Sequence, residues 1–123
     1  MTTNWQRVEQ YFGKDNLKRL SESRVGVIGL GSGGSFVALS LAMSGVGNFV
    51  LVDNDELEEG NVVRHAADRR YVGWNKAKAV ADLIEHRNPN VTIDVREGLI
   101  QEHMDIFDDL DIRKIPERDR VKL

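Results

Sequence analysis

The residues best suited to chemistry form a pattern typical of nucleotide binding. Gly29, Gly31 and Gly34 fit Gly-x-Gly-x-x-Gly, and Gly33 adds a fourth glycine. Such a turn lets the backbone approach phosphate oxygens, and the following helix contributes free N–H groups and a positive dipole. Asp53 lies 19 residues beyond Gly34, where a carboxylate can accept both hydroxyls of a ribose. The pattern predicts a nucleotide site, against the alternative that the glycines only permit tight packing of a helix on a strand.

Two further features favour a triphosphate. The loop after Asp53 contains Asn61-x-x-Arg64, and Gly73-x-x-Lys76 opens the next predicted helix. A fixed guanidinium can bind terminal phosphates in bidentate fashion, and a lysine at a helix start can neutralise charge that builds on an α-phosphate under attack. Neither feature has a use in a plain dinucleotide fold, so the sequence favours ATP over NAD.

The elements that must position these residues follow from apolar runs and breaks. We predict buried strands at 24–28 and 48–52, a third strand at 91–95 and a helix at 75–87. The helix at 34–44 is apolar nearly all round, so we expect it to be buried. Two short amphipathic helices are expected within 5–21, with a break at Gly13. This order predicts an α/β fold, a Rossmann-like parallel sheet with flanking helices preceded by short N-terminal helices.

Length and composition limit the function classes. The 123 residues suffice for one modest core, which we divide into an N-terminal helical segment (1–22), a Rossmann-like ATP-binding domain (23–108) and a charged tail (109–123). A net charge of -3 argues against nucleic-acid or anionic-membrane partners. The absence of cysteine excludes disulfides, thiolate zinc ligands and a cysteine nucleophile, and three scattered histidines predict no metal site. With no apparent signal peptide or membrane span, we expect a cytoplasmic protein.

Between about Leu17 and Leu99 the sequence resembles the ThiF/MoeB/E1 family of ATP-dependent adenylyltransferases, which activate ubiquitin and ubiquitin-like sulfur carriers. The resemblance is carried, in order, by the glycine turn, "SGVGNFVLVDND", "NVVRH", "VGWNKAKAV" and "RNPNV". Within "NVVRH", His65 stands where many relatives have glutamine.

The resemblance implies ATP and magnesium as cofactors and a ubiquitin-like or sulfur-carrier protein as partner. AMP would be joined to the C-terminal glycine carboxylate of that protein, with release of pyrophosphate. By the same resemblance the four glycines line the nucleotide, Asp53 holds the ribose, and Asn61, Arg64 and Lys76 contact the phosphates, with Lys76 and Arg64 as the catalytic pair. Asp55 is a further binding candidate, although a solvated acidic loop is its simplest reading. Family members also admit an arginine from a neighbouring subunit, for which Arg7 is the nearest candidate in an expected homodimer.

The C-terminal part departs from the family pattern. The family continues into a further strand that ends in a magnesium-binding carboxylate, and the stretch after position 98 has no such strand; Asp108, Asp109 and Asp111 cannot be equated with that ligand. We therefore expect a truncated version of the fold, a fragment or a natural minimal form. A fragment is favoured because a three-stranded parallel sheet exposes an edge and an apolar helix face, which also predicts self-association.

Two other functions stay open. The glycine turn and Asp53 also suit an NAD-binding oxidoreductase or regulatory domain, which would leave Arg64 and Lys76 without a role. A non-catalytic partner subunit of an activating enzyme would keep the fold and bind no nucleotide.

Overall fold

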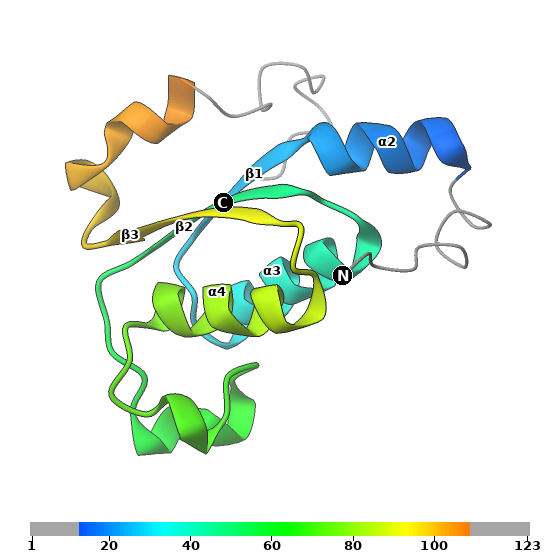
Figure 1. Ribbon diagram of the computed structural model, residues 1–123. Helices are drawn as coiled ribbons and strands as arrows, with labels where there is room; N and C mark the ends of the chain where they lie inside the picture. Colours follow the sequence, from blue (N-terminus) through cyan, green and yellow to red (C-terminus); the bar gives the residue numbers. More distant parts are fainter. Residues whose placement is uncertain (1–12, 109–123) are drawn as a thin grey trace.

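A computed structural model describes residues 13–108, which contain a parallel three-stranded sheet (Figure 1). The main elements are α2 (Lys14–Glu22), β1 (Arg24–Ile28), α3 (Ser32–Ser44), β2 (Asn48–Asp53), α4 (Lys76–Arg87) and β3 (Thr92–Glu97). Four 3-10 turns complete them: η1 (Glu59–Arg64), η2 (Arg69–Tyr71), η3 (Ile100–Glu102) and η4 (Met104–Asp108). The predicted Rossmann-like α/β sheet with flanking helices is confirmed.

The central strand β2 is the best buried part of the sheet. It pairs in parallel with β1 and with β3, so that Leu51 lies between Val27 and Val95. Phe49 and Leu51 point to one face of the sheet, and Val50 and Val52 join a different cluster on the other face. Because both faces are covered, β2 reads as a continuous apolar run, as expected of a central parallel strand.

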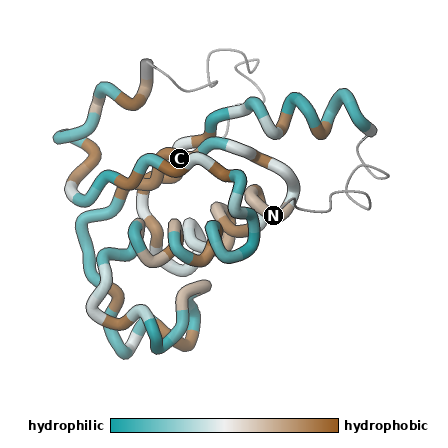
Figure 2. Tube along the Cα trace, in the orientation of Figure 1, coloured by the Kyte–Doolittle hydropathy of each residue, from teal (hydrophilic) through white to brown (hydrophobic). Residues whose placement is uncertain are grey.

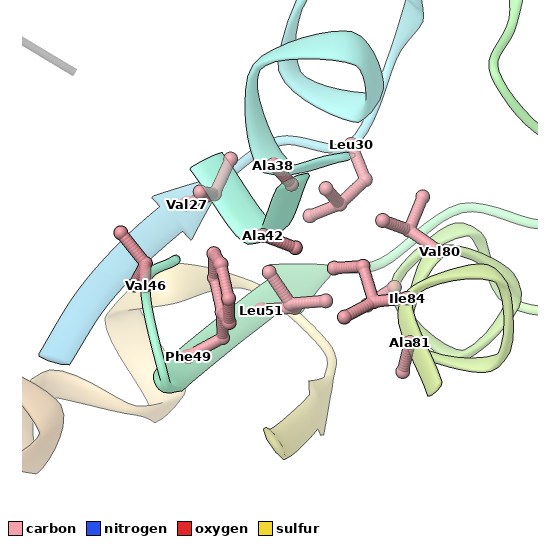
Figure 3. Close-up of a cluster of buried hydrophobic side chains, with 11 residues drawn as sticks. Val27, Leu30, Ala38, Ala42, Val46, Phe49, Leu51, Val80, Ala81 and Ile84 are labelled. Atoms are coloured by element: carbon pink, nitrogen blue, oxygen red, sulfur yellow. The ribbon is translucent and has the colours of Figure 1, made fainter. Parts of the chain in front are cut away.

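The main core lies between the sheet and the two helices α3 and α4 (Figure 3). Its buried side chains are Val27, Leu30, Ala38, Ala42, Val46, Phe49, Leu51, Ala77, Val80, Ala81 and Ile84. The opposite face is covered by the C-terminal turns, whose Ile106 is buried against Val50 and Val52. The carboxyl ends of all three strands therefore emerge between two packed layers.

Helix α2 lies on the amino-terminal edge of this core. It is mostly hydrophilic along its length (Figure 2), and Leu20 packs against the main core. The Gly47 N–H donates to the Leu20 carbonyl at 3.2 Å, and the Asn48 side-chain amide donates to the Ser21 carbonyl at 3.3 Å. A single apolar edge and a few backbone contacts hold the helix in place.

The prediction that the helix after the glycine turn is buried was wrong. Of its residues only Ser35, Ala38 and Ala42 are buried, whereas Phe36, Val37 and Met43 are about half exposed. The sheet and α4 cover one side of α3, and residues 13–108 contribute no layer over its outer side. Composition alone could not show this, because burial of a helix face needs a partner element.

Element ends also differ in detail from the predicted ones. Helix α3 begins at Ser32, two residues before the expected start, with Gly31 as its N-cap, and β3 runs to Glu97, two residues beyond the expected end. The first predicted helix with Arg7, and the tail with Asp109 and Asp111, lie outside the described residues; Asp108 ends η4. None of the helices described is long and apolar enough to cross a membrane.

Candidate functional site

The four glycines after β1 differ in whether the structure requires a glycine at their position. Gly29 has a φ of +88°, a conformation that L side chains rarely adopt. A Cβ on Gly34 would lie 2.0 Å from the Gly29 carbonyl oxygen, so Gly34 allows α3 to pack on the turn. A Cβ on Gly31 or Gly33 would meet nothing within 4 Å, and neither has a positive φ. Tight packing therefore explains only part of the pattern, and open space remains at the N-terminus of α3.

Leu30, between the first two glycines, is fixed from both sides. Its N–H donates to Asp53 Oδ2 at 2.6 Å, and its carbonyl oxygen lies 2.5 Å from His65 Nε2. Its side chain is fully buried in the main core. The turn is thus held by one residue at the end of β2 and one in the loop that follows.

Asp53 connects the segments of the site. Its other carboxylate oxygen accepts the Asp55 N–H at 2.8 Å. Its carbonyl accepts the Asn75 side-chain amide and the Gly98 N–H, each at 2.9 Å. The residue is only 8% exposed, and each carboxylate oxygen keeps a lone pair beyond its backbone donor. Asp53 has this positioning role whether or not it also meets a ribose, which stays a prediction.

Asn75 places the start of α4, and with it Lys76. The Asn75 side-chain oxygen accepts the Ala77 and Lys78 N–H groups at 2.8 and 3.3 Å, the geometry of an N-cap. The Lys76 N–H donates to the Asp55 carbonyl at 2.9 Å. Within residues 13–108 the half-buried Lys76 side chain has no ion-pair partner, so its charge is free for a ligand.

The loop after β2 carries Asn61 and Arg64 on η1. The Asn61 side-chain oxygen accepts the Glu58 N–H at 2.9 Å and so stabilises the turn, while its amide nitrogen has no acceptor among the described residues. Arg64 is exposed and has no carboxylate partner in the described part of the chain. Two other arginines of this loop are paired, Arg69 with Glu59 and Arg70 with Asp68.

The pairing of Arg70 has an electrostatic consequence. Its guanidinium hydrogen-bonds the Asp68 carboxylate and lowers the pKa of Asp68. Arg69 and Arg70 therefore have partners within the loop, whereas Arg64 is left without one in residues 13–108.

A cavity of about 500 Å³ adjoins Asp53 at the carboxyl ends of β2 and β3. It is lined by Asn54, Glu56, Gly73, Trp74, Asn75, Lys78, Glu97 and Gly98. The Lys78 ammonium lies 5.3 Å from the centre of the Trp74 ring, so both side chains form one wall. The glycine turn and Arg64 lie outside this lining.

The structure therefore links the glycine turn, Asp53, the η1 loop and the start of α4 through short hydrogen bonds. Two positioning residues, His65 and Asn75, were missed by sequence reasoning. Asn75 carried a signal, an N-cap residue directly before a helix, whereas the partner of His65 is a distant backbone carbonyl. Within 13–108, no three histidines, aspartates or glutamates gather as a metal site.

Comparison with known proteins shows which family has this arrangement. A model of the ThiF family matches residues 4–113. The chain belongs to the ThiF family. The motifs from the glycine turn to "RNPNV" thus lie within one family match, and the adenylyltransferase resemblance is confirmed at the level of the family.

Relatives within the ThiF family differ in their named reactions. The chain is 37% identical over 83 residues to an adenylyltransferase and sulfurtransferase, MOCS3-1 of Zea mays, covering 67% of this chain and 18% of that protein. It is 45% identical over 94 residues to a tRNA threonylcarbamoyladenosine dehydratase of Bacillus subtilis, covering 76% and 37%. The crystal structure of the E. coli dehydratase in complex with ATP matches with a TM-score of 0.77 and 27% identity, over 83% of this chain and 44% of that one. The chain spans less than half the length of each of these relatives.

Proposed function

We propose that this chain is the nucleotide-binding part of an ATP-dependent adenylyltransferase. The observation that carries the proposal is the open space at Gly31 and Gly33, at the N-terminus of α3. The segments that carry Arg64 and Lys76 are hydrogen-bonded to this turn through His65 and Asp53, and neither cation has an ion-pair partner in residues 13–108. An anion of high charge suits all of these features together. The ATP complex of a related structure supports a nucleotide as that anion.

In the proposed reaction a carboxylate oxygen attacks the α-phosphorus of ATP. The bond from that phosphorus to the oxygen bridging to the β-phosphate breaks, and pyrophosphate leaves with the electron pair. The substrate supplies the nucleophile, so the protein contributes alignment and charge neutralisation. Arg64 and Asn61 would contact the terminal phosphates, and Lys76 would neutralise the charge that develops on the α-phosphate.

The ribose and base would lie on the Asp53 side of the site. The cavity beside Asp53 offers Asn54, Trp74 and Gly98 as neighbours for a nucleoside, and Asp55 is exposed next to it. ATP would bind with magnesium, for which no ligand is assigned among the described residues. This arrangement puts the phosphates at the N-terminus of α3 and the nucleoside toward β3.

The acceptor carboxylate in our proposal is the C-terminal glycine of a ubiquitin-like or sulfur-carrier protein. The adenylyltransferase and sulfurtransferase relative supports this choice. The tRNA-modifying relatives support a second candidate, a carboxylate on a modified tRNA base. We further propose a homodimer, since the half-exposed Phe36, Val37 and Met43 of α3 offer an apolar face for association.

Thermal unfolding with saturating Mg-ATP, Mg-ADP, NAD or no ligand tests the nucleotide. A hundredfold excess over the dissociation constant adds roughly 2.7 kcal/mol, a shift of several degrees in a domain of this size. We expect the shift with Mg-ATP to be lost in Arg64→Ala and kept in Arg69→Ala, whose side chain pairs with Glu59. A shift with NAD alone would assign the chain to the dinucleotide-binding alternative, and no shift with any nucleotide would favour a non-catalytic subunit.

Lys76→Ala tests the reaction. ATP-dependent pyrophosphate exchange with a sulfur-carrier protein or modified tRNA should fall far more than ATP affinity, because the charge that Lys76 neutralises develops during attack. Equal losses in exchange and in affinity would contradict the assigned role.

A further inference from the structure

The imidazole of His65 is buried and hydrogen-bonded through both nitrogens. His65 is only 7% exposed. Nδ1 lies 2.9 Å from the Ala67 N–H, which can only donate, so Nδ1 is the acceptor and carries no proton. Nε2 therefore carries the proton, and the Nε2–H donates a hydrogen bond to the Leu30 carbonyl oxygen. The neutral Nε2–H tautomer is the form that satisfies both contacts.

The Leu30 carbonyl shares its peptide unit with the Gly31 N–H. In a trans peptide the two groups point in opposite directions, so a carbonyl fixed by His65 fixes the direction of the Gly31 N–H as well. That N–H has no acceptor within residues 13–108. A Cβ built on Gly31 would meet nothing within 4 Å, so there is unfilled space around this glycine at the start of α3. His65 thus controls one donor of the proposed phosphate cradle from the side remote from the ligand.

We propose that His65 is a positioning residue for the nucleotide site, which aims the Gly31 N–H by holding the Leu30 carbonyl with its neutral Nε2–H. The inference rests on the proposed function only for the identity of the ligand. A second proton on the ring would place an N–H donor at Nδ1 against the Ala67 N–H, so the contact that orients the ring would be lost. Nucleotide affinity should then weaken on protonation of the ring.

Few charged groups face the ring. Arg64 precedes it in the chain, Asp68 lies three residues on and is engaged by Arg70, and Asp53 lies across Leu30 with its carboxylate bound to backbone N–H groups. From α3 the Ser35 hydroxyl accepts the N–H of Ala66, the residue after His65, at 3.2 Å.

Glutamine provides the matched substitution. Its amide offers one acceptor and a donor side by side, as the neutral imidazole does, but it does not titrate. We therefore expect His65→Gln to keep nucleotide affinity at pH 7.5 and His65→Leu to lose it. His86→Gln serves as the control, since His86 is an exposed histidine on α4 whose ring contacts only Asp82 in the described residues.

Titration calorimetry with saturating magnesium, from pH 7.5 to pH 5.5, measures the effect on ATP. Protonation of the ATP phosphates acts on all variants alike, so the ratio between variants isolates His65. The wild-type chain and His86→Gln should lose about fivefold more affinity than His65→Gln, the factor that corresponds to about 1 kcal/mol for one hydrogen bond. Parallel loss in wild type and His65→Gln, or equal weakening by glutamine and leucine at pH 7.5, would overturn the proposal.

An amide NMR titration without nucleotide separates this inference from the proposed function. The Leu30 and Gly31 amide signals should follow His65 protonation in the wild type and stay still in His65→Gln. Signals that do not respond would overturn the positioning contact even if ATP binds. A responding Gly31 amide in a chain that binds no ATP would instead overturn the proposed function, and with it the nucleotide as the ligand that His65 serves.

Discussion

Two adjacent glycines in the first turn of α3 should respond in opposite ways to the same added methyl group. A Cβ on Gly34 would lie 2.0 Å from the oxygen and 3.1 Å from the carbon of the Gly29 carbonyl, whereas a Cβ on Gly33 would meet nothing within 4 Å. Neither glycine has a positive φ, so alanine fits the backbone conformation at both sites. The pair isolates steric contact from every other effect of replacing glycine.

The size of the difference follows from which atoms collide. The Gly34→Ala methyl strikes backbone and not a flexible side chain, so α3 or the turn must move by about an ångström or more; overpacking costs about 1–3 kcal/mol, and this contact belongs at the upper end. Gly33→Ala instead gains up to about 1 kcal/mol, because alanine loses less conformational entropy in a helix. One kcal/mol corresponds to about 4 °C or more in a domain of this size, so the two variants should differ by about 10 °C or more.

Thermal unfolding followed by circular dichroism measures the difference. Gly34→Ala should melt well below the wild type, and Gly33→Ala at or above it, as should Gly60→Ala, another open position. With Mg-ATP added, Gly33→Ala should gain less stability than Gly60→Ala, because the new methyl occupies the space proposed for phosphate. Equal melting temperatures for Gly33→Ala and Gly34→Ala would refute the packing argument.

Two further variants test the supports of the site and sheet. Asn75→Ala removes the cap of α4 and a donor to the Asp53 carbonyl. It should lower the free energy of unfolding, measured by urea titration, by about 1–2 kcal/mol. Asn90→Ala is the control, and equal urea midpoints for the two variants would contradict the capping role of Asn75. The hydrogen bond from Arg96 lowers the pKa of Asp94 in the folded state. The stability that this hydrogen bond contributes is therefore present above the pKa of Asp94 in the unfolded chain, and it is lost as the pH falls through the lower pKa of the folded state. The difference in unfolding midpoint between wild type and Arg96→Met should therefore shrink below about pH 4, and a difference that stays constant down to pH 2 would count against this linkage.

The sequence predicted the sheet well because a central parallel strand leaves a continuous apolar run, as in β2, and a helix with a capping residue has a local signal, as in α4. The exposure of the outer side of α3 could not be predicted, because it depends on whether another element packs there, and residues 13–108 contain none that does. The contact of His65 with Leu30 was equally hidden, since a backbone carbonyl 35 residues away leaves no trace in composition or spacing.

The glycine motif and Asp53 also show why a motif position is a poor probe of ligand binding. Replacing Asp53 would remove the acceptor of the Leu30 and Asp55 N–H groups, so a loss of ATP binding in that variant would follow from a disordered turn as readily as from a missing ribose contact. The same holds for Gly29 and Gly34, whose conformation and packing already require glycine. The charged groups of Arg64 and Lys76 have no ion-pair partner within the described residues, so their substitution should leave the fold intact. A nucleotide role is therefore decided by these two cations and by Gly33, and not by the residues that make the motif recognisable.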